Sequence, residues 1–175
     1  DSGGFVSVDK PPRGLWVQVL SAEAFGFHGW ALMLPQALAA VASVALVYYL
    51  VKRVFGKAAG LLAALIMAIT PIVVAASRNN TMDTQLVFTS LLAAWAVTLA
   101  AERGKLRWLL ACAFLVGLGF NIKMLQAFLV LPAFYLLYLV AAPHPIWKRI
   151  AHLGAASLVL VVVSLSWAVA VDLTP

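Results

Sequence analysis

Long apolar runs separated by short polar clusters are the feature that most constrains how this chain can fold. Each run is close to the about 20 residues that a helix needs to cross the hydrocarbon core of a bilayer, the fourth being short. The runs cover residues 30–51, 58–76, 84–101, 107–122, 125–142 and 150–171. In lipid every backbone polar group must be satisfied internally, which helices do within one segment. The sequence therefore predicts an all-α, polytopic transmembrane helix bundle.

Composition excludes a soluble domain. Of the 175 residues, 65% are hydrophobic and only 10% are charged, and the mean hydropathy is +1.03, so the charged residues could not cover a soluble surface. The single cysteine, Cys112, lies in an apolar run, which excludes a disulfide framework and a cysteine-based metal site. We expect one membrane-domain fragment over residues 1–175, internal to a longer protein. It comprises an outer interfacial segment at 1–29 and about six transmembrane helices over 30–171.

The net charge of +6 does not indicate a nucleic-acid partner, because the basic residues stand singly or in small groups beside apolar runs. Their distribution instead predicts the orientation by the positive-inside rule. Three alternate loops hold most of them: Lys52, Arg53 and Lys57, then Arg103, Lys105 and Arg107, then Lys148 and Arg149. The opposite side carries every acidic residue except Glu102. We therefore expect a multi-pass cell-membrane protein whose N-terminal segment is periplasmic or extracellular.

Residues 13–25 mix apolar Leu15 and Trp16 with polar Gln18 and Glu23. This pattern favours a helix that lies in the membrane interface, in contact with membrane lipid, rather than one that crosses it.

Three polar clusters fall on the predicted outer face, at residues 8–14, 77–83 and 119–126. In the first, Asp9 and Lys10 precede two prolines, and a carboxylate beside an ammonium can hold a metal ion or a phosphate. A solvated loop before a helix is the alternative. In the second, the guanidinium of Arg78 suits a phosphate, whereas Asp83 also suits the dipole of a following helix. In the third, Lys123 either contacts an anion or extends to the interface.

The middles of the runs lack acidic and basic residues. A coupled transporter more often places such residues near the bilayer midplane. Here they gather at the outer water–lipid boundary, where an enzyme would act on a lipid phosphate.

The same clusters resemble the bacterial GT-C glycosyltransferases of the protein-mannosyltransferase-like family (glycosyltransferase family 39, aminoarabinose-transferase-like). Residues 8–12, with the following Gly-Leu-Trp at 14–16, are similar to the first outer loop, where Asp9-Lys10-Pro11 replaces a Glu-Lys-Pro. The second cluster, residues 77–83, ends in Asp83 before an apolar run and looks like the Asn-x-x-Asp loop, and residues 119–124 are similar to the Gly-x-x-x-x-Lys turn. The resemblance covers the whole chain and implies a partial GT-C membrane fold.

The resemblance implies an integral-membrane glycosyltransferase that moves a sugar from a polyprenyl-phosphate donor to a glycan, lipid or protein acceptor at the outer face. It assigns Asp9 and Asp83 as catalytic carboxylates, with Asp9 also as ligand of a divalent metal ion. The substrate-binding residues that it implies are Lys10, Arg78, Asn79, Lys123 and Gln126. The family's catalytic base is an aspartate that would precede Asp1. A transporter or flippase module for a lipid-linked substrate is the alternative, and a scaffold that only binds lipid head groups is a third reading.

Overall fold

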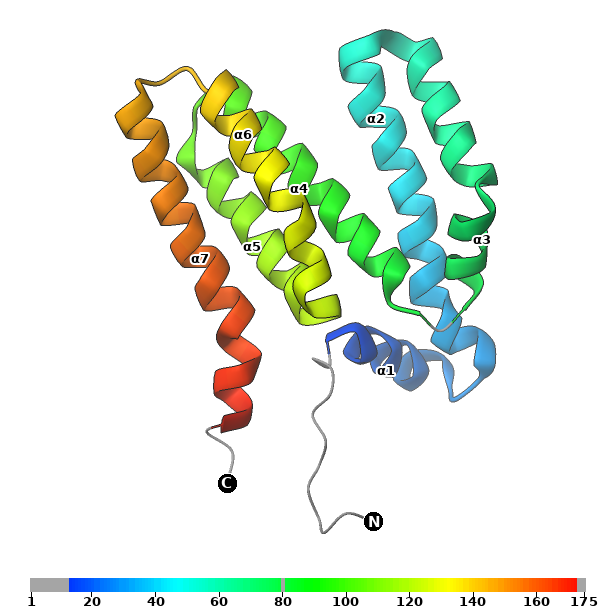
Figure 1. Ribbon diagram of the computed structural model, residues 1–175. Helices are drawn as coiled ribbons and strands as arrows, with labels where there is room; N and C mark the ends of the chain where they lie inside the picture. The colour runs from blue at the N-terminus through cyan, green and yellow to red at the C-terminus, as the bar shows by residue number, and fades with distance from the viewer. Residues whose placement is uncertain (1–12, 80, 173–175) are drawn as a thin grey trace.

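The computed structural model describes residues 13–79 and 81–172, and the regular structure in these ranges is helical (Figure 1). The elements are α1 (Arg13–Phe25), α2 (Gly29–Ile69), α3 (Pro71–Arg78), α4 (Asp83–Arg103), α5 (Leu106–Lys123), the 3-10 helix η1 (Met124–Val130), α6 (Leu131–Ala141) and α7 (Ile146–Asp172). The prediction of an all-α helix bundle is therefore confirmed.

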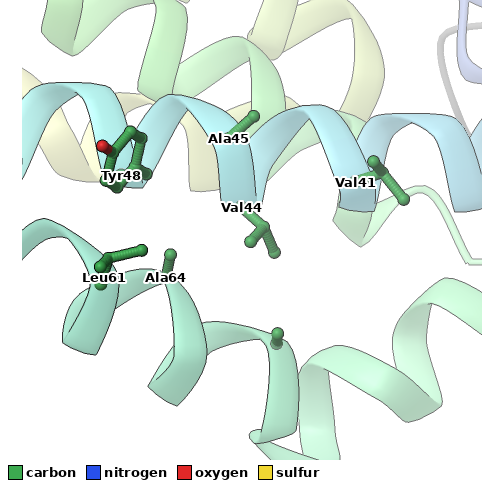
Figure 2. A pocket seen from close by; sticks show the side chains of 7 residues that line it. Val41, Val44, Ala45, Tyr48, Leu61 and Ala64 are labelled. Carbon is green, nitrogen blue, oxygen red and sulfur yellow. The ribbon is translucent and has the colours of Figure 1, made fainter.

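Four stretches in the described ranges are long and apolar enough to cross a membrane: Gly29–Ile69, Asp83–Arg103, Leu106–Ala141 and Ile146–Ala170. The first reverses direction at Gly56, whose φ of 88° and ψ of 173° lie outside the helical region. A positive φ costs glycine little because it has no Cβ. The two arms of α2 then run side by side (Figure 1). Figure 2 shows the apolar cleft between them, of about 430 Å³, with Val44 on one arm opposite Leu61 and Ala64 on the other.

The third stretch is divided at Met124, which has φ 49° and ψ −133° and ends α5 directly after Lys123. The chain continues through η1 into α6, so the predicted run at 125–142 begins as a 3-10 helix. The predicted run at 58–76 is also interrupted, because Thr70 is extended before Pro71. The division into one membrane domain with about six crossings stays a prediction.

The core lies among α4, α5, α6 and α7 and is rich in small side chains. Buried alanines, with Val97, Leu109, Tyr138 and Leu160, form one contiguous cluster. Small residues allow helices in lipid to approach closely. Close packing holds such helices together, because lipid tails are as apolar as the side chains and there is no hydrophobic driving force between the helices. At Gly117 of α5 the two helices approach closely: an added Cβ would lie 2.8 Å from the Cβ of Val163 on α7.

The two ends of the bundle differ in charge. The turn inside α2 and the C-terminal turn of α4 meet at one end through the ion pair between Arg53 and Glu102. At the same end, the Nε2 atom of His144 is 2.7 Å from the carbonyl oxygen of Gly104. The basic loops predicted to share one side thus lie at a common end, called here the basic end (Figure 1).

Helix α1 lies across the opposite end, and its bounds are those expected for the interfacial helix (Figure 1). Trp16 packs edge-to-face on Trp167 of α7 with ring centroids 5.8 Å apart, and the Ser21 hydroxyl donates to the Ala31 carbonyl oxygen at 2.6 Å. Its large apolar side chains are exposed, whereas Gln18 and Ser21 are buried. This inverted polarity suits a helix whose outer face contacts lipid.

Candidate functional site

An ion pair joins α4 to α5 at the end of the bundle covered by α1. The Lys123 ammonium donates to the Oδ1 atom of Asp83, although the two residues are 40 positions apart. Asp83 is the first residue of α4 and Lys123 the last of α5, so each charge is favoured by the dipole of its own helix. The side chains are 37% and 40% exposed, so the pair is accessible to a ligand from outside the bundle.

Local backbone geometry fixes the positions of both members. The unusual positive φ of Met124 ends α5 at Lys123, so this lysine stands at the rim and not inside a helix. On the other side, α3 ends at Arg78, and the Asn79 N–H caps it by donating to the Ala75 carbonyl oxygen at 3.1 Å. The short connection that follows brings the chain to the start of α4 at Asp83. Non-glycine residues with positive φ are uncommon and favour a functional explanation.

An apolar cavity of about 620 Å³ lies beside the pair. It is formed by α1, α2, α4 and the end of α5, with walls that include Leu20, Phe25, Leu38, Phe88, Gln85 and Ile122. Ile122 directly precedes Lys123, and Gln85 is two residues beyond Asp83. The ion pair therefore lies within one helical turn of a cavity whose walls are mostly hydrophobic, although neither Asp83 nor Lys123 lines it.

Several buried polar atoms near this end have no hydrogen-bond partner within the described part of the chain. They are both amide atoms of Gln36, the Thr84 hydroxyl, the Gln85 amide nitrogen and the Asn121 amide oxygen. The Asn121 nitrogen, in contrast, donates to the Val163 carbonyl oxygen on α7 at 2.8 Å. An unpaired buried polar group is costly, so such groups point to a ligand or water that completes them.

The sequence interpretation missed these glutamines and Asn121 as candidate site residues. Two signals could have indicated them. Thr84 and Gln85 extend the polar start of α4 beyond what the helix dipole needs. Gln36 stands alone in an otherwise apolar run, directly after Pro35.

The other predicted side chains stay apart. Arg78 and Asn79 are exposed at the end of α3, and Gln126 is exposed in η1. Across residues 13–79 and 81–172, none of the three has a side-chain hydrogen bond or ion pair to another described residue. Asp83 thus has Lys123 as its partner and not Arg78.

Asp9 and Lys10 lie outside the described residues. In the described ranges no three His, Cys, Asp or Glu side chains lie close enough together to hold a metal ion. The described residues therefore do not fit a metal centre, and the expected divalent ion rests on Asp9 alone.

Comparison with known proteins agrees with this architecture. Residues 9–167 match the family described as dolichyl-phosphate-mannose-protein mannosyltransferase. YkcB of Bacillus subtilis (strain 168), whose name assigns it provisionally to the mannosyltransferases, is 54% identical over 175 residues, covering 100% of this chain and 24% of YkcB. An undecaprenyl phosphate-α-4-amino-4-deoxy-L-arabinose arabinosyl transferase of Pseudomonas fluorescens is 33% identical over 174 residues, covering 93% of this chain and 30% of that protein.

The crystal structure of ArnT from Cupriavidus metallidurans in the apo state superimposes with a TM-score of 0.72 at 26% identity, over 93% of this chain and 31% of that one. The chain spans about a quarter to a third of the length of these relatives. Because the match covers most of the chain in both sequence and fold, the chain belongs to the dolichyl-phosphate-mannose-protein mannosyltransferase family and forms part of a GT-C membrane fold.

Proposed function

We propose that this chain is part of a membrane glycosyltransferase that moves a sugar from a polyprenyl-phosphate donor to an acceptor at the outer membrane face. The observation that carries the proposal is the Asp83–Lys123 ion pair within one helical turn of the apolar cavity. A polyprenyl-phosphate sugar likewise combines a charged group with an apolar one, because its phosphate joins a long hydrocarbon chain to a sugar. The names of the arabinosyl transferase relatives include undecaprenyl phosphate, which supports this donor class.

The cavity offers the hydrocarbon chain an apolar surface close to the ion pair. Its walls come from α1, α2, α4 and the end of α5, and most of the residues in them are hydrophobic. Three polar residues also line it. The hydroxyls of Ser21 and Thr89 donate to backbone carbonyl oxygens. The amide nitrogen of Gln85 has no partner among the described residues and can donate to a phosphate or sugar oxygen.

In the proposed reaction an acceptor oxygen attacks the anomeric carbon as the bond from that carbon to the phosphate oxygen breaks. The bonding electrons leave with the polyprenyl phosphate, and the acceptor proton passes to a carboxylate. The Lys123 ammonium stabilises the charge that develops on the phosphate. Because Asp83 already accepts from Lys123, we assign Asp83 to holding that ammonium in place. Asp9 would be a second carboxylate of the site, and the acceptor proton would pass to the aspartate expected before Asp1.

The exposed side chains on the same end extend the proposed site. Arg78, Asn79 and Gln126 stand at the ends of α3 and in η1, where they could reach the donor phosphate or the acceptor once these are bound. Lys10 would add a second ammonium. The basic loops lie at the opposite end, which the positive-inside rule places in the cytoplasm, so the ion pair would face the periplasm or the exterior.

The test uses the full-length protein reconstituted in vesicles with undecaprenyl-phosphate mannose or undecaprenyl-phosphate 4-amino-4-deoxy-L-arabinose. Sugar transfer and release of undecaprenyl phosphate are followed together. We expect Lys123→Gln to lower kcat/KM by about ten- to a hundredfold, because a charge-assisted contact to phosphate is lost. Lys57→Gln, at the basic end, is the matched control and should retain activity. Movement of the donor across the bilayer without any transfer would replace this proposal with a flippase.

A further inference from the structure

A second cleft, of about 400 Å³, lies at the basic end, far from the Asp83–Lys123 pair. It is formed by the end of the first arm of α2, the last turns of α4 and the start of α5. Its walls combine three cations with three aromatic rings: Lys52, Arg53, Arg103, Tyr49, Trp95 and Trp108. Nothing in the proposed transfer reaction uses these residues.

The cleft has more positive than negative charge. Glu102 is the carboxylate that pairs with Arg53 here. Among the described residues no carboxylate pairs with Lys52 or Arg103, whose charged groups instead lie 5.2 Å from the ring centre of Tyr48 and 5.8 Å from that of Trp108. The dipole of α4 accounts for Arg103 in its last turn. It does not account for two further cations that α2 brings to the same place.

The cleft opens into an apolar groove between α2 and α4. A neighbouring cavity of about 470 Å³ shares Tyr49 and Trp95 with it, and is otherwise lined by residues such as Leu46, Phe88 and Leu92. A positively charged and aromatic pocket at the helix ends thus continues as a hydrocarbon surface toward the middle of the bundle. A free anion would occupy only the charged and aromatic pocket. A phospholipid would occupy this pocket with its head group and the hydrocarbon surface with an acyl chain.

We propose that this cleft and groove bind an anionic phospholipid of the leaflet at the basic end. The phosphate would contact Lys52, Arg53 and Arg103, and one acyl chain would lie along the groove between α2 and α4. Basic pockets between membrane helices attract anionic head groups, and aromatic rings favour the depth of the head group. The inference goes beyond the transfer reaction, because it concerns the opposite end of the bundle.

The experiment is native mass spectrometry of the full-length protein released from nanodiscs that contain equal amounts of phosphatidylglycerol and phosphatidylcholine. The test variant is Lys52→Gln/Arg103→Gln. The matched control is Lys57→Gln/Lys105→Gln, which removes the same charge at the same end from exposed side chains outside the cleft. We expect the wild type and the control to retain phosphatidylglycerol in preference to phosphatidylcholine. The test variant should bind phosphatidylglycerol at least about tenfold more weakly.

Thermal melts show whether the variants are folded, and Lys52→Arg/Arg103→Lys, which keeps both charges, should retain the lipid if neutralisation unfolds the protein. Equal losses in the test and control variants would overturn the proposal in favour of diffuse charge attraction. Unchanged retention in both would also overturn it, and would assign the groove to another segment of the full-length protein. Displacement of the lipid by millimolar inorganic phosphate would overturn the choice of a phospholipid.

Discussion

The substitution Asp83→Asn separates a role in the site from a role in stability. It removes the charge that accepts from Lys123 but keeps the size of the side chain and much of its capacity to cap α4. Both members of the pair are more than a third exposed, at 37% and 40%. Exposed pairs contribute about 0.2–1 kcal/mol and a charge at a helix end about 0.3–1 kcal/mol. We therefore expect Asp83→Asn to reduce the free energy of unfolding by about 0.5–2 kcal/mol.

The effect on transfer should be larger. If Asp83 holds the Lys123 ammonium where the donor phosphate binds, Asp83→Asn should weaken the charge-assisted contact between that ammonium and the phosphate. Such a contact contributes about 1.5–3 kcal/mol. This corresponds to a fall of about ten- to a hundredfold in kcat/KM. The assay is transfer from undecaprenyl-phosphate sugar by the full-length protein, with thermal melts of the same samples.

The chain offers a matched control at its other end. Glu102 pairs with Arg53 between two helices, and its side chain is 48% exposed. Glu102→Gln makes the same carboxylate-to-amide change and should leave transfer unchanged. It should cost less stability than Asp83→Asn, because the dipole of α4 disfavours a negative charge in its last turn. A normal transfer rate in a stable Asp83→Asn protein would refute the assignment and reduce Asp83 to a partner of the helix dipole. An equal loss of rate in Glu102→Gln would show that general destabilisation, and not the site, is being measured.

Three further outcomes are expected. Gly117→Ala should destabilise the protein by about 1–3 kcal/mol in thermal melts, because the added Cβ would overlap α7. Gly154→Ala, with open space around the residue, should be neutral or slightly stabilising. Equal effects of the two substitutions would contradict the close packing of α5 on α7. Cysteines introduced at Ser77 and Lys57 should react with an impermeant reagent from opposite sides of the membrane, and labelling of both from one side would refute the orientation. Lys10→Ala should lower transfer by about tenfold or more while Lys57→Ala does not, and equal activity would return Lys10 to a solvated loop.

Much of the architecture could be predicted from the sequence because the relevant quantity is local. The free energy of placing a segment in lipid is a sum over its own residues, so apolar runs indicate helices and polar clusters indicate their ends. The bounds of α1 and the shared end of the basic loops follow in the same way. This sum over residues does not predict where a long apolar run is interrupted. The extended Thr70 before Pro71 and the 3-10 helix after Met124 depend on backbone angles within apolar sequence.

The same distinction between local sequence and tertiary structure applies to the candidate site. The sequence by itself determined that Asp83 and Lys123 stand at helix ends on one side, since both fall in polar clusters that alternate with basic loops. Only the tertiary structure decided that they pair, that Arg78 stays apart, and that Gln36, Gln85 and Asn121 are buried. Lateral packing decides these contacts, as it decides that Gly117 of α5 lies against Val163 of α7. Lipid tails are as apolar as the side chains that pack, so hydropathy carries no signal about which helix faces which.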